Sequence, residues 1–358
     1  MDFGLSEEQR LLQDTIRKLL ADAFPTTRAR EVSKTASAHD ASLWKQLAEN
    51  GALGALIPEK HGGSELSFLD AMLIAEEIGR AAGPGAYTAT AVMAAVALGD
   101  SPDEALHKEL LPQIAAGTTR IGVALAEAHG ARDGARVRID HGRANGVALF
   151  ALDAVEADRL LVYTSGELAL LSVAAPGVEV IPLAAIDGTR RFAEVRLHSA
   201  DVLALLGATE RALAAGRLAL AFDSLGASER ALELALAYVA ERKQFGRVIG
   251  SFQAVKHMLA EIAAALEPAR SLAWYAAHVF DHEPRDAEGM AALCKAHLSE
   301  VASDVLRKAT EVHGGIGFTE QYDLHLWFRR VALTRPLLGG PDLLRDQAQR
   351  LRGERRPL

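Results

Sequence analysis

The sequence contains only one cysteine, Cys294, among 358 residues. A single thiol cannot form an intrachain disulfide, and chains without disulfides are typical of reducing, intracellular compartments. The first residues, MDFGLSEEQR, carry acidic side chains and no apolar run, which is unlike a secretory signal. We therefore expect a cytoplasmic protein.

Long hydrophobic runs and blocks of like charge are also missing. The longest uncharged stretch, 81–99, contains Pro84, three glycines and two threonines, so it is too polar for a membrane span. It is more typical of a loop followed by a buried helix. The net charge of −8 is spread along the chain. We therefore expect neither a membrane nor a nucleic acid as a partner.

Several catalytic signatures are absent from the sequence. It has no G-x-S-x-G elbow, no P-loop and no G-x-G-x-x-G after a strand, so hydrolase and Rossmann interpretations lack support. His278 and His282 have the i, i+4 spacing of helical metal ligands, but no third ligand is evident in that helix. We expect no metal.

The hydrophobic patterns divide the chain into three parts. Residues 1–118 are typical of an all-α domain, and Ser6 with Gln9 fits a capping box. Short apolar runs separated by turn signals follow in 119–207, which indicates a small β-barrel or sandwich. Residues 208–358 contain long helical patterns at roughly 209–244, 251–281, 287–313 and 320–334, which predict a four-helix bundle.

Two motifs in the last part have both a structural and a functional interpretation. ERKQFGRVIGSFQAVKHMLAEI fits a helix end at Gly246 and a helix capped by Ser251, but Arg242 and Gln253 would also flank free backbone donors that suit a phosphate. EVHGGIGFTE fits a helix stop at Gly314, yet paired glycines also allow a ligand to approach the backbone closely. The residues alone leave both alternatives open.

Taken together, RKQFG, Gln253 and EVHGGIGFTEQYDLHLWFRR resemble the acyl-CoA dehydrogenase family. IPEKHGGSELSFLDAMLIAEEIGR resembles that family's common start, so the resemblance covers essentially the whole chain. It implies a multidomain α and β fold with an N-terminal all-α domain, a small middle β-barrel and a C-terminal four-helix bundle. It also implies an FAD-dependent oxidoreductase that desaturates an acyl-CoA thioester and passes electrons to electron-transfer flavoprotein or a similar acceptor.

The resemblance assigns a group of residues to the adenosine and pyrophosphate half of an FAD that a neighbouring subunit mainly binds. Glu311 departs from the family, which usually has glutamine there. The implied residues are Arg242, Gln244, Phe245, Gln253, Glu311, Gly314 and Gly315.

The flavin-ring half of the site differs from the family. AEAHGARD (126–133) and FAL (150–152) stand where family members have segments like TEPGAGSD and WIT. The hydroxyl groups that reach the flavin ring are missing, so we expect this chain to bind its own flavin ring weakly or not at all.

The two positions where family members carry the catalytic glutamate are both glycine here. Alignment places Gly339, within RPLLGGPD, at one position and Gly216, before the implied substrate-binding residue Arg217, at the other. The alternatives for a displaced base are Asp223 and Asp342.

These features predict a subunit that lacks its base and works beside a homologous partner in a hetero-oligomer of two plus two chains. The resemblance to steroid side-chain enzymes favours a steroid CoA ester as the substrate. Two alternatives remain, namely a self-sufficient homo-oligomeric dehydrogenase with a displaced aspartate, and a flavin-free scaffold or acyl-CoA-binding protein.

Overall fold

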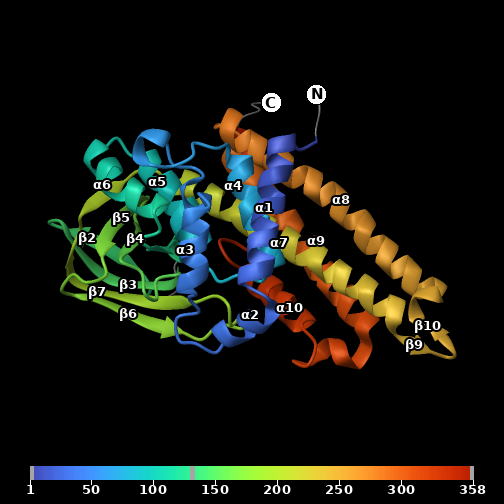
Figure 1. Ribbon diagram of the computed structural model, residues 1–358. Coiled ribbons are helices and arrows are strands. Elements are labelled where there is room, and N and C mark those ends of the chain that lie inside the picture. The colour runs from blue at the N-terminus through green and yellow to red at the C-terminus, as the bar shows by residue number, and fades with distance from the viewer. Residues whose placement is uncertain (1–3, 130–133, 355–358) are drawn as a thin grey trace.

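The structure, a computed structural model, describes residues 4–129 and 134–354. Helices come first along the chain, a β-sheet follows, and long helices complete it (Figure 1). This order confirms the predicted fold class.

The N-terminal helices form where capping signals precede apolar periodicity. Ser6 Oγ accepts a hydrogen bond from Gln9 N, and Gln9 Oε1 accepts one from Ser6 N, both at 3.1 Å, so the predicted capping box is present. The uncharged stretch forms a loop and then a buried π-helical segment, Tyr87–Ala94, that continues into α5. The helices are α1 (Glu7–Ala23), α2 (Thr26–Val32), α3 (Ala41–Glu49), α4 (Phe68–Arg80), α5 (Ala95–Gly99) and α6 (Glu104–Ala115).

The middle sheet has the strand order β6-β7-β3-β1-β4-β5-β8, with β2 paired to β3. Among the pairs of described strands in this sheet, only β1 and β4 run parallel. The described strands leave β6 and β8 at the two ends of the path, so the sheet is open and the predicted barrel is not closed. The strands are β1 (Ile121–Ala124), β2 (Val137–Asp140), β3 (Arg143–Leu152), β4 (Arg159–Thr164), β5 (Glu167–Ser172), β6 (Val178–Leu183), β7 (Phe192–Asp201) and β8 (Ala204–Leu206).

Three of the C-terminal helices, with 33, 30 and 27 residues, are longer than the longest N-terminal helix described, which has 17. No helix within the described ranges is long and apolar enough to cross a membrane. The helices are α7 (Thr209–Glu241), α8 (Gln253–His282), α9 (Ala287–His313), α10 (Leu324–Thr334) and α11 (Pro341–Glu354).

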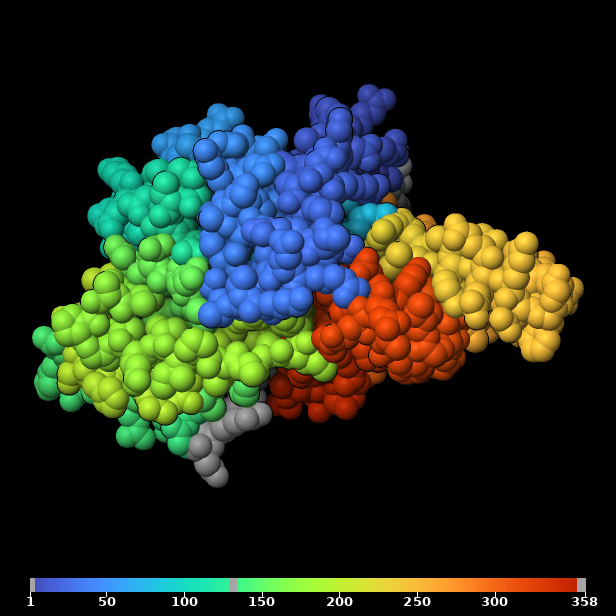
Figure 2. Space-filling view, turned by 60° about the horizontal axis from the view of Figure 1, so that its bottom comes forward, coloured from blue at the N-terminus to red at the C-terminus, as the bar shows by residue number. Residues whose placement is uncertain are grey.

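A small hairpin of β9 (Lys243–Gln244) and β10 (Arg247–Val248) connects α7 to α8 and corrects two predictions. Helix α7 ends at Glu241, before the predicted end near residue 244, because the chain turns back through Phe245 and Gly246, both at positive φ. Ser251 does not cap α8, since its hydroxyl donates to Val248 O at 2.7 Å. The hairpin lies at the end of the bundle farthest from the sheet and protrudes from the molecule (Figures 1 and 2).

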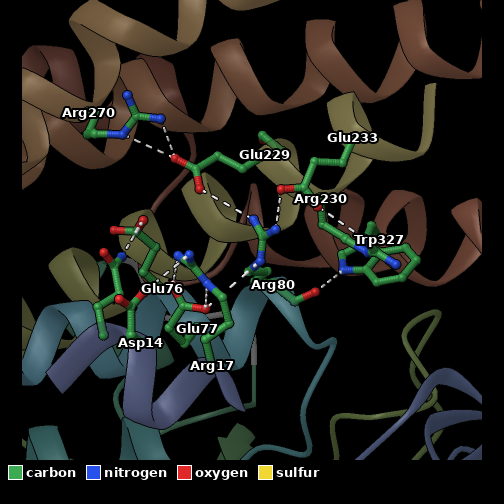
Figure 3. A network of polar contacts seen from close by, with 12 residues as sticks. Asp14, Arg17, Glu76, Glu77, Arg80, Glu229, Arg230, Glu233, Arg270 and Trp327 are labelled. Atoms are coloured by element: carbon green, nitrogen blue, oxygen red, sulfur yellow. Dashed lines mark hydrogen bonds and ion pairs between the residues drawn. The ribbon is translucent and has the colours of Figure 1, made fainter. Parts of the chain in front are cut away.

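A network of charged side chains joins α1 and α4 to the bundle (Figure 3). Arg17 donates to both carboxylate oxygens of Glu77, at 2.9 and 2.7 Å. Arg80 lies 3.6 Å from Glu229, which also accepts a 3.1 Å hydrogen bond from Arg270 Nε. Bidentate arginine–carboxylate geometry fixes the relative orientation of the helices that carry these groups.

Glu76 is the member of this network with the least complete pairing. One oxygen accepts from Gln13 Nε2 at 3.2 Å, while the other is buried and has no hydrogen-bond partner among the described residues. Burial, together with the nearby carboxylates of Glu229 and Glu77, raises the pKa of Glu76 well above its usual value. The carboxyl group is therefore neutral over part of the pH range in which an ordinary glutamate is ionised.

Candidate functional site

A cavity of about 380 Å³ lies between the middle sheet and the turn that connects α10 to α11. The sheet contributes apolar side chains such as Val123, Leu149 and Leu152, and α7 contributes Leu220. The turn contributes residues 336–340. The segment RPLLGGPD is therefore a turn and also one wall of a cavity.

Two buried basic side chains donate hydrogen bonds to this turn and to the end of α10, which precedes it. Arg217 Nε donates to Leu338 O at 3.0 Å, and Lys295 Nζ donates to Thr334 O at 2.9 Å. Leu338 has a φ of 55° and Gly339 a φ of 111°, so the backbone is left-handed at two consecutive residues. A non-glycine residue at positive φ is uncommon and persists only where its surroundings fix it.

The turn contains Gly339 and packs against Gly216, and a side chain at either glycine would require the ends of neighbouring side chains to shift. A Cβ on Gly216 would lie 2.6 Å from Met93 Sδ and 2.8 Å from Leu338 Cδ1. A Cβ on Gly339 would lie 2.6 Å from Leu344 Cδ2, at a φ that side chains rarely adopt. Met93 and Leu338 both line the cavity, so apolar groups fill the space beside Gly216.

Arg217, the predicted substrate-binding residue, is 0% exposed and is not among the residues that line the cavity. Its Nη2 donates to Gln347 Oε1 at 2.9 Å, and its buried Nη1 has no hydrogen-bond partner within the described part of the chain. Burial lowers the pKa of Arg217 to about 10. In this chain its observed contacts are with the turn and with α11.

Asp223, the first alternative base, belongs to a buried ion cluster. Its carboxylate accepts from Arg190 Nη2 at 2.8 Å and from Arg330 Nη2 at 2.6 Å. Burial alone would raise the pKa of Asp223, but these two arginines hold it below the usual value. Asp223 does not line the cavity, and both of its oxygens already accept hydrogen bonds.

Asp342, the second alternative base, points into solvent. Its side chain is fully exposed and lies 3.2 Å from Arg345 Nη1 in the first turn of α11. The next residue, Leu343, lines the cavity, but Asp342 does not. The structure thus places Gly339 in the cavity wall and Gly216 beside Met93 and Leu338, which line the cavity, and leaves both aspartates outside it.

Glu127 is the one carboxyl group that lines the cavity among the described residues. Its Oε1 accepts from Leu149 N at 2.9 Å, while Oε2 is buried and without a partner in the described structure. Burial raises the pKa of Glu127. In the sequence this residue is distinguished only by its place within AEAHGARD, where an acidic side chain beside an expected cofactor is the available signal.

The cavity does not fit the rim of a flavin ring, which presents several hydrogen-bond acceptors. Ala126, Phe150 and Leu152, from the two altered segments, line it, and among the described residues its lining side chains include no hydrogen-bond donor while Glu127 is ionised. Phe150 has a φ of 53° at an irregularity in the β3–β7 pairing. Residues 130–133 of AEAHGARD lie outside the described residues.

The residues assigned to the adenosine half of FAD lie elsewhere, at the protruding end of the bundle. Arg242 and Gln244 are exposed, Phe245 is 91% exposed at the tip of the hairpin, and Gln253 is exposed at the start of α8. An exposed phenyl ring and guanidinium of this kind suit a surface that another molecule covers.

The glycine motif lies beside this end of α7. Tyr238, one helical turn before Arg242, stacks on His313 with 4.6 Å between the ring centroids, and Gly314 follows His313. The space where a Cβ of Gly314 or Gly315 would lie is open, so a ligand can approach the backbone there. Glu311, the family departure, pairs with Arg307 at 2.6 Å. The fold therefore brings the two cofactor motifs together.

His278 and His282 stack on the face of α8 with ring centroids 4.2 Å apart. The described residues contain no group of three or more histidine, cysteine, aspartate or glutamate side chains that could hold a metal ion.

Comparison with known proteins gives the same family along most of the chain. Residues 6–118 match the acyl-CoA dehydrogenase N-terminal domain, and residues 206–351 match the C-terminal domain. Acyl-CoA dehydrogenase IpdE2 of Mycobacterium tuberculosis is 31% identical, with 97% of each chain covered. The Tcur3481-Tcur3483 steroid ACAD superposes with a TM-score of 0.90 at 29% identity, covering 97% of this chain and 98% of that one. The ChsE4-ChsE5 complex from Mycobacterium tuberculosis gives 0.91 at 25% identity, with both chains fully covered.

Proposed function

Because the chain belongs to the acyl-CoA dehydrogenase family, we propose that it is a subunit that completes the FAD site of a homologous partner and lacks a catalytic base of its own. The family consists of FAD-dependent oxidoreductases that introduce an α,β double bond into acyl-CoA thioesters. The base that removes the α-proton and the pocket for the flavin ring would then belong to the partner.

The observation that carries this proposal is the composition of the cavity beside Gly216 and Gly339. A general base must come within hydrogen-bond reach of the proton it removes. Met93 and Leu338 occupy the space at Gly216, Asp223 is enclosed by Arg190 and Arg330, and Asp342 is in solvent. None of these positions supports proton transfer in this chain.

The retained cofactor residues support the second half of the proposal. Arg242 would donate to the pyrophosphate, the open backbone at Gly314 and Gly315 would allow close approach, and Phe245 would cover the cofactor. Bound FAD supplies the acceptor for the hydride that leaves the acyl β-carbon. The hairpin protrudes from the end of the bundle (Figure 2), which supports a contact with the FAD of a neighbouring subunit.

The similar proteins suggest the finer identity of the substrate and assembly. The Tcur3481-Tcur3483 protein is a steroid ACAD, and ChsE4-ChsE5 is a complex of two differently named chains. For this chain we propose a steroid side-chain CoA ester as the substrate and an assembly of two plus two chains. The electron acceptor would be electron-transfer flavoprotein or a similar protein. A cytoplasmic location remains a prediction from the sequence.

A dehydrogenation assay on the reconstituted complex, with an artificial electron acceptor, tests the division of labour. Replacing the partner's catalytic glutamate by glutamine should lower turnover by about 10²-fold to 10⁴-fold, because a positioned general base contributes that much. Asp342→Asn in this chain should leave turnover unchanged.

The alternatives predict different results in the same assay. A self-sufficient homo-oligomer would dehydrogenate acyl-CoA without any partner and would lose activity on Asp342→Asn or Asp223→Asn. A flavin-free scaffold would leave the FAD content and turnover of the partner unchanged when it is added. Either result would contradict the proposal.

A further inference from the structure

We propose that a cluster of three aromatic rings, from Tyr238, His313 and Tyr322, positions the groups that hold the cofactor, with His313 as the positioning residue. The aromatic cluster holds the two cofactor motifs, at the end of α7 and at the end of α9, at a fixed spacing. None of the three residues is among those that the resemblance assigns to FAD. The inference deepens the proposed function and rests on it, because it concerns the same cofactor end of this chain.

The aromatic cluster joins three separate segments of the chain. The His313 ring, at the end of α9, stacks on Tyr238 of α7 with 4.6 Å between the ring centroids and 27° between the ring planes. It meets the ring of Tyr322, which precedes α10, at 4.7 Å and 50°. The two tyrosine rings lie 5.9 Å apart, edge to face. Aromatic pairs favour centroid separations of about 4.5 to 7 Å and stabilise beyond the apolar area that they bury.

Short stretches of fixed backbone connect the aromatic cluster to the groups assigned to FAD. Arg242 N donates to Tyr238 O at 2.9 Å, so the last turn of α7 links the Tyr238 ring to the Arg242 side chain. Gly314 directly follows His313 and begins a short turn that folds back on it, because a Cβ on Gly317 would lie 2.9 Å from His313 Cβ. A shift of the His313 ring would therefore move the two motifs relative to each other.

His313 is itself fixed within the fold. It is 3% exposed, and its Nδ1 lies 2.6 Å from Ala309 O, so this nitrogen carries the hydrogen and donates it. Burial lowers the pKa of His313, so the ring is neutral at about pH 7. Nε2 is buried without a hydrogen-bond partner in the described part of the chain, so on that side the ring acts through packing.

The aromatic cluster affects cofactor affinity through preorganisation. A site that is already ordered loses less conformational entropy when its ligand binds. Groups that touch a ligand therefore depend on neighbours that lock their positions. Removing the His313 ring should leave Arg242 and the backbone at Gly314 chemically intact but free to move relative to each other. FAD should then bind more weakly, although every group assigned to it is retained.

The test is the dissociation constant of FAD in the reconstituted complex, measured by the recovery of flavin fluorescence on dilution. His313→Ala should raise this constant at least about fivefold, because the preorganisation is lost. His313→Phe keeps a ring and should bind FAD within about twofold of the unaltered complex. His313→Asn keeps a donor for Ala309 O without the ring, so it should behave like the alanine variant. His39→Ala, which removes a histidine ring 6.3 Å from Trp44 between α2 and α3, is the control and should have no effect.

A double-mutant cycle with Arg242→Ala separates positioning from a general loss of stability. The fold-change caused by His313→Ala should shrink at least about threefold when residue 242 is already alanine, because residues that act together are not additive. A substitution that only destabilises the fold would give the same fold-change in both backgrounds. Circular dichroism spectra establish that each variant is folded. If His313→Ala does not fold, Tyr322→Ala takes its place in the cycle, with Tyr322→Phe as the variant that keeps the ring.

The outcomes distinguish this inference from the proposed function. Unchanged FAD affinity in His313→Ala, no rescue by phenylalanine, rescue by asparagine, or equal fold-changes in the two backgrounds would each overturn the inference, even if Arg242→Ala releases FAD. An FAD affinity that responds to neither Arg242→Ala nor His313→Ala would contradict the proposed function as well.

Discussion

Replacing Asp223 by asparagine separates a structural aspartate from a catalytic one, since the two roles predict opposite results in two assays. The carboxylate is 2% exposed and is enclosed by the guanidinium groups of Arg190 and Arg330, at 2.8 and 2.6 Å. Arg330 also donates to Gly83 O at 2.8 Å, so the cluster connects the N-terminal region, the middle region and the bundle. Asparagine keeps an acceptor but removes the charge, which leaves the two buried arginines with Asp187, 3.8 Å from Arg190 and 3.7 Å from Arg330, as their remaining ion-pair partner among the described residues.

Breaking a buried ion pair from one side costs about 3 to 5 kcal/mol. If the free energy of unfolding falls by about 3 kcal/mol per molar urea, the urea concentration at the unfolding midpoint should fall by on the order of 1 M. The pKa of Asp223 is below its usual value in the folded protein, so its contribution is complete above the unfolded value of 3.8 and is lost as pH falls through the lower folded value. The difference in the free energy of unfolding between Asp223→Asn and the unaltered chain should therefore be smallest in strong acid.

The assay is urea unfolding followed by circular dichroism, together with turnover of the reconstituted complex per folded molecule. Asp342→Asn is the matched control, because its exposed carboxylate pairs with Arg345 alone in the described part of the chain, so the midpoint should not change. We expect Asp223→Asn to lose stability and keep its turnover per folded molecule. A hundredfold lower turnover with an unchanged midpoint would refute this reasoning.

Three further variants test the cofactor end, the glycine site and the charged network. Arg242→Ala should weaken the binding of FAD to the complex by roughly tenfold to a hundredfold, measured by flavin release on dilution. Lys243→Ala, at the exposed neighbouring residue, is the control and should have little effect. Equal FAD release from the two variants would show that Arg242 is not part of the site. Gly216→Glu should lower the melting temperature without creating activity in the isolated chain, because its Cβ would meet Met93 and Leu338, whereas Gly99→Glu, where the Cβ position is open, should not. In the unaltered chain, the free energy of unfolding should fall as pH rises above about 4.5 and through the raised folded pKa of Glu76, and Glu76→Gln should remove this fall. Identical pH profiles of the urea unfolding midpoint in the two proteins would contradict the raised pKa.

Local features of the fold could be predicted from the sequence because they depend on neighbouring residues. The capping box of Ser6 and Gln9 is one example, and the buried helix after Pro84 is another. The predicted end of α7 and the predicted capping role of Ser251 were wrong. The hairpin at residues 243–248 is set by the tertiary structure, which a helical pattern in the sequence does not reveal.

The chemistry of the site was harder to predict, because it depends on contacts between distant parts of the chain. Asp223 lies 107 residues before Arg330, and no spacing rule pairs them. Glu127 becomes notable only because the fold places it in the wall of an apolar cavity. The sequence did indicate the missing hydroxyls at Ala126 and Leu152, because a resemblance compares residue types directly and both positions line that cavity.

The most direct test of the central claim is the FAD stoichiometry of the chain purified alone and purified with its homologous partner, measured by flavin absorbance. The account predicts that the isolated chain is colourless or substoichiometric in FAD, because the described side chains of the cavity lining are apolar apart from the carboxyl group of Glu127. It predicts that the co-purified complex is yellow and loses its FAD when Arg242 is changed to alanine. One tightly bound FAD per isolated chain would contradict the account.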